Sequence, residues 1–161
     1  MNSRRGYAVG ISHGQSFIIF GGHDLYINGK GRLSSTEIIT EQGVSAGPEM
    51  PEAVSRHAVA VVNETTSILT GGKQCLSCGK SNKTWFFSHV SQQFQKGPSL
   101  ITARRFHASG TIQDKVTMEN IVAVIGGSGR KPQGYYANFL NSTELLFNGE
   151  SAWQQGKNDV K

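Results

Sequence analysis

Short apolar runs recur along this chain of 161 residues, and a pair of glycines closes three of them. The runs cover residues 17–20, 67–70 and 121–125. The glycine pairs are Gly21-Gly22, Gly71-Gly72 and Gly126-Gly127. Apolar runs of this length suit strands that are buried on both faces. Their spacing of about 50 residues is typical of a repeated structural unit.

Other segments recur at about the same spacing as the glycine pairs, so each unit is interpreted as four short strands. A first segment precedes each run, at residues 7–11, 57–62 and 107–112. A third segment follows a polar loop, at residues 36–40, 84–90 and 143–147. A brief fourth segment carries Val44, Phe94 or Trp153. Helical periodicity is almost absent and the 20 glycines fall at turn spacings, which predicts an all-β fold.

The order of these features resembles the kelch repeat. An arginine stands shortly before each first strand, at Arg5, Arg56 and Arg105. The glycine pair ends the second strand, and an aromatic residue three positions before a glycine ends the unit at Phe94 and Trp153. The first unit departs from the family pattern, because Val44 stands where an aromatic residue is usual. The resemblance implies kelch-type β-propeller blades of four strands, at residues 1–51, 52–101 and 102–158 with a tail at 159–161.

Three blades form an incomplete ring, because propellers close with about 4–8 blades. Two explanations stay open. The chain is a fragment of a longer propeller protein, or a second copy of the chain completes the ring by symmetric association. In both cases the glycine pairs, Phe94 and Trp153 are expected to be structural residues of the blades.

The resemblance also implies a binding face. In kelch propellers the segment before the first strand and the loop after the glycine pair share one face of the disc. The residues expected on this face are Arg5, Arg56, Arg105, His23, Tyr26, Asn28, Lys73, Gln74, Ser128, Arg130 and Tyr135. Arginines around a concave surface suit a peptide that carries carboxylates. The alternative interpretation is that each arginine pairs inside its own blade and holds a turn.

Charge agrees with an acidic protein or peptide partner. The formal net charge is +5, and the basic residues are spread over loops rather than gathered in a stripe. No nucleic-acid-binding motif is present, so nucleic acid is not expected as a partner. No apolar run is long enough for a membrane helix and no signal peptide is recognised, which slightly favours the cytoplasm. Three N-x-Ser/Thr sequons, at Asn63, Asn82 and Asn141, leave secretion open.

The sequence gives little support for metal or catalytic chemistry. Cys75 and Cys78 form half of a zinc-binding pattern without a second half, so no metal or other cofactor is expected. A loop-closing disulfide and two free thiols both remain possible for this pair. No motif of a serine hydrolase or a zinc protease occurs. Glu37 and Glu144 occupy the same repeat position, which favours a structural role over acid–base catalysis.

The function expected from these observations is that of a protein–protein interaction module, not of an enzyme. It would bind a partner peptide or loop at one face, as a substrate-recognition part of a larger adaptor. A fragment of a catalytic propeller, similar to galactose oxidase or acting on another small molecule, is the first alternative. An extracellular adhesion or matrix protein is the second, supported only by the sequons.

Overall fold

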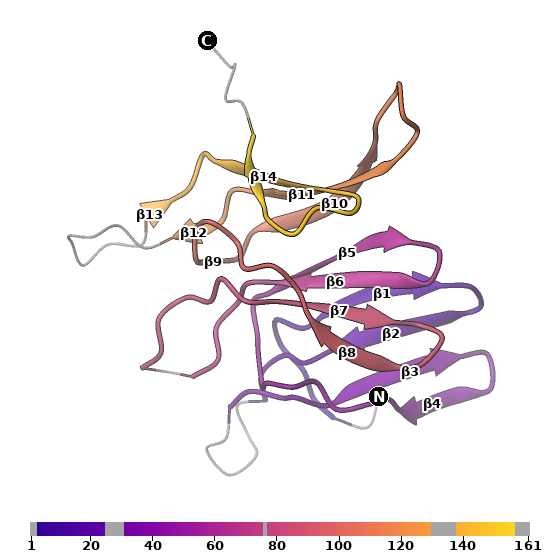
Figure 1. The fold of residues 1–161 in the computed structure, drawn as a ribbon. Coiled ribbons are helices and arrows are strands. Elements are labelled where there is room, and N and C mark those ends of the chain that lie inside the picture. The colour runs from indigo at the N-terminus through magenta and orange to yellow at the C-terminus, as the bar shows by residue number, and fades with distance from the viewer. Residues whose placement is uncertain (1–2, 25–30, 76, 130–137, 157–161) are drawn as a thin grey trace.

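The computed structural model describes residues 3–24, 31–75, 77–129 and 138–156, and every regular element in these ranges is a β-strand (Figure 1). The first sheet contains β1 (Val9–His13), β2 (Ser16–Phe20), β3 (Thr36–Thr40) and β4 (Gly43–Ala46). The second contains β5 (Ala58–Asn63), β6 (Thr66–Thr70), β7 (Thr84–Ser88) and β8 (Gln93–Lys96). The third contains β10 (Ala108–Gln113), β11 (Asn120–Ile125), β14 (Thr143–Phe147) and β15 (Gln154–Gln155). A smaller sheet joins β9 (Arg104–Arg105), β12 (Ser128–Gly129) and β13 (Asn138–Phe139).

All strand pairs are antiparallel, and each four-stranded sheet follows the order of the chain. The predicted all-β class and the repeated four-stranded unit are therefore confirmed. The first strands begin one or two residues later than predicted. The reason is a left-handed backbone at Tyr7, Arg56 and Phe106, with φ of 55°, 61° and 55°. A left-handed residue cannot continue a strand, so each strand starts after it.

A β-bulge in β5 explains a shift between the first two units. Val9 pairs with Phe20 in the first sheet, and Ala58 pairs with Thr70 in the second. The register of β5 shifts between Val61 and Asn63, so this strand holds one residue more than β1. Positions before the first strand are consequently offset by one residue relative to positions after it.

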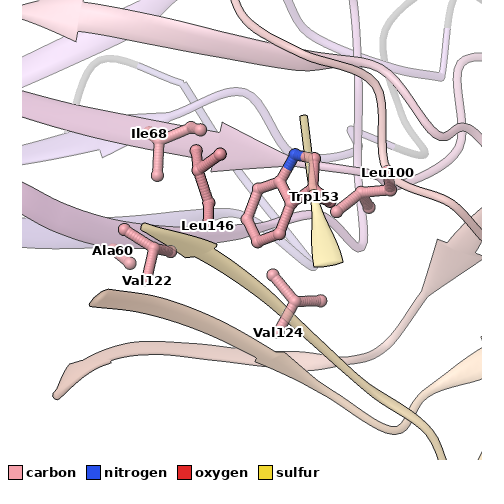
Figure 2. Packing of buried hydrophobic residues seen from close by; sticks show 7 residues of the cluster. All are labelled: Ala60, Ile68, Leu100, Val122, Val124, Leu146 and Trp153. Atoms are coloured by element: carbon pink, nitrogen blue, oxygen red, sulfur yellow. The ribbon is translucent and has the colours of Figure 1, made fainter. Parts of the chain in front are cut away.

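Two apolar clusters hold the sheets together. One lies between the second and third sheets and contains Ala60, Ile68, Leu100, Val122, Val124, Leu146 and Trp153 (Figure 2). The other lies between the first and second sheets and contains Ile18, Phe20, Met50, Val54, Leu69 and Phe87. Trp153 is 5% exposed, and its indole N–H donates to the Pro98 carbonyl at 2.9 Å. Phe94 packs against Phe87 with ring centroids 4.8 Å apart.

The glycine pairs receive the segment that leads into the next sheet. We call residues 5–8, 54–57 and 104–107 the leading segments. A Cβ atom on Gly21 would lie 2.5 Å from the Val54 carbonyl oxygen, and one on Gly71 would lie 2.5 Å from the Arg104 carbonyl oxygen. Gly22 donates its N–H to Val54 at 2.9 Å. The missing side chains thus let one sheet approach the next, in addition to permitting a positive φ.

The first and third sheets each bury one ion pair with the same surroundings. Arg5 contacts Glu37 at 2.8 Å, and Arg104 contacts Glu144 at 2.5 Å. Arg5 also donates to the Gly21 carbonyl oxygen and Arg104 to the Gly126 carbonyl oxygen, both at 2.9 Å. Each acceptor is the first glycine of a glycine pair. All four side chains are at most 2% exposed. Glu37 and Glu144 are therefore structural residues, since hydrogen bonds compensate their buried charges.

The second sheet replaces this ion pair by apolar residues. Val54 stands at the position of Arg104, two residues before the left-handed residue, and Trp85 stands at the position of Glu144 in the strand register. Both contribute to the cluster between the first two sheets. A cavity of about 20 Å³ lies between them, which is about the space of one water molecule. The repeat therefore tolerates either an ion pair or an apolar pair at this position.

Two buried histidines face the glycine pairs of the second and third sheets. His57 and His107 are 4% and 7% exposed, and both lie against the second glycine of their own sheet. Burial, with a smaller effect of the charge of His107, lowers the pKa of His57 to about 3. Burial also lowers the pKa of His107 to about 4, with a smaller effect of Arg104. Both side chains are therefore neutral in the folded protein near pH 7.

These pKa shifts predict a loss of stability in mild acid. Because the unfolded chain protonates its histidines near pH 6.5 and the folded chain does not, stability falls as the pH drops below 6.5. At pH 5.5 each buried histidine should lower the free energy of unfolding by about 1.4 kcal/mol relative to pH 7.5. Urea unfolding at the two pH values measures this loss. His57→Ala, which introduces the residue that the first unit has at Ala8, should reduce this loss by about 1.4 kcal/mol, and an unchanged loss would contradict the assignment.

None of the described residues forms a helix that is long and apolar enough to cross a membrane.

Candidate functional site

One edge of the molecule gathers the leading segments and the loops that follow the glycine pairs, at the left in Figure 1. In the first unit His23 bridges both Gly6 and Arg32. In the second unit Lys73 bridges Ser55, and in the third β12 pairs with both β9 and β13. The same short ladder therefore extends each sheet at this edge. We call this side of the molecule the loop edge.

Arg56 lies at the centre of the loop edge, between two aromatic rings. Its guanidinium carbon is 4.8 Å from the ring centroid of Tyr7 and 5.0 Å from that of Phe106. The three residues occupy equivalent left-handed positions, and Phe106 donates its N–H to the Arg56 carbonyl at 3.0 Å. Contacts with the faces of two rings stabilise the cation and fix its position.

Three further cations surround Arg56. The guanidinium carbon of Arg105 lies 5.5 Å from the ring centroid of Phe106. Burial lowers the pKa of Arg32, and the charges of Arg56 and Arg105 lower it further. Burial also lowers the pKa of Lys73, and the charges of Arg56 and Arg105 lower it further. The four groups therefore repel one another, and an anion between them would relieve this repulsion.

The described residues provide no ion-pair partner for these four cations. The ion pairs that join two described residues include Arg5–Glu37, Arg104–Glu144 and Lys83–Glu52, and none of these involves the four cations. The Nε atoms of Arg32, Arg56 and Arg105 are buried and have no hydrogen-bond acceptor within the described residues. Guanidinium groups in this state are suited to bind carboxylates or other oxyanions.

A carboxyl group and a histidine lie beside the cations. Asp24 is 3% exposed, and its negative charge raises the pKa of the neighbouring His23. Burial and the charges of Arg32 and Arg56 lower the same pKa more strongly, so the balance is downward. The His23 side chain is therefore mostly neutral near pH 7 and adds a polar group rather than a charge.

Arg5 does not belong to the loop edge, although the sequence pattern places it with Arg56 and Arg105. Arg5 is equivalent to Val54 and Arg104 instead, because each of these stands two residues before the left-handed residue of its unit. Its side chain is buried in the ion pair with Glu37. The arginine column expected from the sequence is therefore wrong in register at Arg5, whose side chain has the structural role that the sequence left as the alternative.

The other expected residues of the binding face take several places. His23, Lys73 and Ser128 lie at equivalent positions of the three ladders, and Gln74 follows Lys73. Tyr26, Asn28, Arg130 and Tyr135 lie outside the described residues. Sequence reasoning missed Arg32, which enters the edge through its bridge to His23. Arg32 was hard to predict from the repeat, because no other unit has an arginine at this position.

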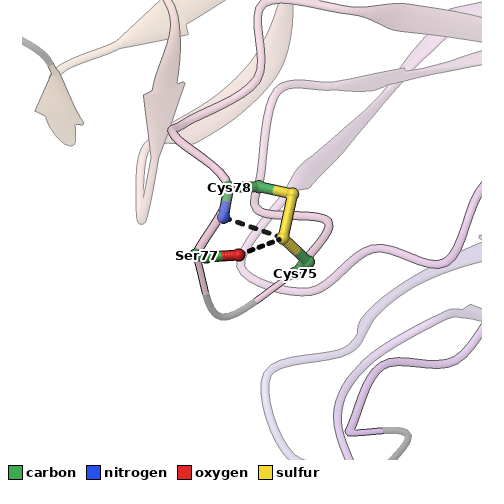
Figure 3. The surroundings of a disulfide bond; sticks show 3 residues. All are labelled: Cys75, Ser77 and Cys78. Carbon is green, nitrogen blue, oxygen red and sulfur yellow. Dashed lines mark hydrogen bonds between the residues drawn. A yellow bond between two sulfur atoms is a disulfide. The ribbon is translucent and has the colours of Figure 1, made fainter.

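A disulfide stands close to the cations. Cys75 and Cys78 are joined with a sequence separation of three residues (Figure 3). The Cys78 N–H donates to Cys75 Sγ at 2.7 Å. Of the two states left open by the sequence, the structure has the loop-closing disulfide. It constrains the loop that begins at Lys73.

The cations gathered at the loop edge are complementary in charge to an acidic ligand. Arginine side chains stay protonated throughout the physiological range, so they act as fixed positive charges and not as proton acceptors. Among the described residues, no three His, Cys, Asp or Glu side chains gather in a way that could hold a metal ion. Neither a protein-family model nor a curated protein matches the chain.

Proposed function

We propose that the chain is an interaction module of the kelch-propeller type, and that its loop edge binds an acidic segment of a partner protein. The observation that carries the proposal is the group of Arg32, Arg56, Arg105 and Lys73, which has no ion-pair partner within the described residues. A ligand with several carboxylates would supply the missing acceptors. Loops on a repeated scaffold are a common place for such recognition.

The contacts between successive first strands support the propeller arrangement. Thr111 on β10 hydrogen bonds to the Val61 carbonyl on β5, and Asn120 donates to the Val62 carbonyl at 2.9 Å. Strand β1 also contacts β5. The first strand of each sheet thus adjoins the first strand of the next, as expected for blades arranged around a common axis. The repeated glycine, arginine and aromatic positions support the kelch type.

A titration with a labelled hexaglutamate peptide tests the proposed binding. The wild-type chain should raise the fluorescence anisotropy of hexaglutamate and should leave hexaglutamine unchanged. The double substitution Arg56→Gln and Arg105→Gln should weaken binding by about a hundredfold or more, because it removes two charged hydrogen bonds that contribute about 1.5–3 kcal/mol each. Binding should also weaken as the salt concentration rises.

Lys115→Gln is the matched control, because it removes a positive charge from the exposed turn between β10 and β11. This variant should bind hexaglutamate like the wild type. Circular dichroism of all variants excludes unfolding as the cause of a loss. The proposal fails if the double variant binds as well as the wild type, or if hexaglutamine binds equally well.

A further inference from the structure

The two outer sheets leave apolar side chains uncovered. On the third sheet Ile112 and Ile125 are each 53% exposed. On the first sheet Phe17 is 40% exposed, on the side opposite to Ile18 and Phe20, which face the second sheet. The second sheet packs on the third with one of its two faces. In strand register, the uncovered face of the third sheet is equivalent to that face of the second sheet. These two faces therefore lack the packed neighbour that the facing sides of the three four-stranded sheets have.

The internal junctions follow a fixed hydrogen-bond rule. The second glycine of each pair donates to the leading segment of the next sheet, from Gly22 to Val54 at 2.9 Å and from Gly72 to Arg104 at 2.8 Å. The left-handed residues also connect in series. The Arg56 backbone N–H donates to the Tyr7 carbonyl, and the Phe106 N–H donates to the Arg56 carbonyl, both at 3.0 Å.

At the two ends of this series, four backbone groups that could pair with one another have no backbone hydrogen-bond partner within the described residues. The Gly127 N–H and the Phe106 carbonyl have no partner on the third sheet. The Arg5 carbonyl and the Tyr7 N–H have none on the first sheet. Extending the rule by one step pairs Gly127 with an Arg5 carbonyl and Phe106 with a Tyr7 N–H.

The third sheet also keeps space for the missing neighbour. A Cβ atom on Gly21 or Gly71 would lie 2.5 Å from the carbonyl oxygen of the next leading segment. At the equivalent Gly126 the nearest atom is the Leu140 oxygen, at 3.4 Å. The glycine is present, but the segment that it accommodates elsewhere is missing.

We propose that a second copy of this chain covers both uncovered faces. The third sheet of each copy packs on the first sheet of the other, and the six sheets form a closed ring with twofold symmetry. The first sheet fits this position because its buried Arg5–Glu37 pair repeats the Arg104–Glu144 pair, which the third sheet carries where it meets the second. The proposal rests on the propeller arrangement proposed above, but not on the acidic ligand. In such a ring Tyr7 of the second copy lies beside Phe106 and extends the loop edge.

Mass measurement by light scattering tests the ring, together with one substitution and its matched control. The wild-type chain should have twice the 17.4 kDa mass of one copy. Gly126→Asn should give a folded monomer, because asparagine tolerates the φ of +64° but its Cβ atom would collide with the Arg5 carbonyl of the second copy. Gly149→Asn should remain a dimer, because Gly149 has a φ of +77° and no atom within 4 Å of an added Cβ atom.

A wild-type monomer would overturn the proposal, and so would an open series of higher oligomers. A Gly126→Asn variant that dimerises as tightly as the wild type would also overturn it, because the contact at Gly126 would then be absent. Circular dichroism shows whether the monomeric variant keeps its strands. A wild-type monomer that still binds hexaglutamate would contradict the ring and leave the proposed function in place. A wild-type dimer that does not bind hexaglutamate would contradict the proposed function and leave the ring in place.

Discussion

Glu144→Ala should destabilise the protein by about 3–5 kcal/mol, because it leaves the Arg104 guanidinium buried without its counter-charge. Both side chains are fully buried, and Glu144 also accepts hydrogen bonds from the N–H groups of Ile101 and Thr102 at 2.7 and 2.9 Å. The substitution therefore removes the acceptor of three donors at once. Urea unfolding at one fixed protein concentration measures the loss, since any association also contributes to stability.

The second sheet shows how the same position is filled without charges, and it suggests the control. The double substitution Arg104→Met and Glu144→Leu should recover the part of the loss that comes from the unpaired guanidinium, because apolar residues of similar volume often replace a buried ion pair at little cost. The N–H groups of Ile101 and Thr102 would still lack their acceptor, so the recovery should be partial. Val54 and Trp85 are the natural precedent in this chain. A double variant less stable than Glu144→Ala alone would contradict the equivalence of the three sheets.

Trp153→Ala should also cost about 3–5 kcal/mol, the usual cost of truncating a buried aromatic residue. The indole fills the space between the second and third sheets beside Leu100, Val124 and Leu146, as Figure 2 shows. Its loss leaves a cavity and removes the hydrogen bond to the Pro98 carbonyl. Urea unfolding at fixed protein concentration measures the change.

Val116→Ala serves as the control for Trp153→Ala, because Val116 is 90% exposed and contributes no core packing. It should change the free energy of unfolding by less than about 0.5 kcal/mol. If Trp153→Ala were equally neutral, the third sheet would not be packed on the second through this side chain.

Much of the fold was predictable from local pattern alone. Apolar runs that end in glycine pairs mark the second strand of each sheet, and the alternation around them marks the neighbours. These signals depend on residues close together in the sequence, so each unit could be interpreted by itself. The small sheet of β9, β12 and β13 escaped prediction because each of its strands has only two residues and no periodicity.

The candidate site was harder to predict because it depends on register. The left-handed backbone places Arg56 in line with Tyr7 rather than with Arg5, and the extra residue in β5 contributes to this shift. The sequence alone does not show on which side of the first strand the extra residue lies. The neighbouring Arg104 and Arg105 add a second ambiguity, since either could be the repeated arginine. The structure resolves it through contacts, because only Arg104 repeats the hydrogen bonds of Arg5.

Amide hydrogen exchange with and without hexaglutamate tests most directly whether the loop edge is the binding surface. The account predicts slower exchange in the leading segments 54–57 and 104–107 and in the loop after Gly72, where Arg56, Arg105 and Lys73 lie. The opposite edge, including the turn between β10 and β11, should be unchanged. Protection confined to that opposite edge, or binding without any change at the loop edge, would contradict the account.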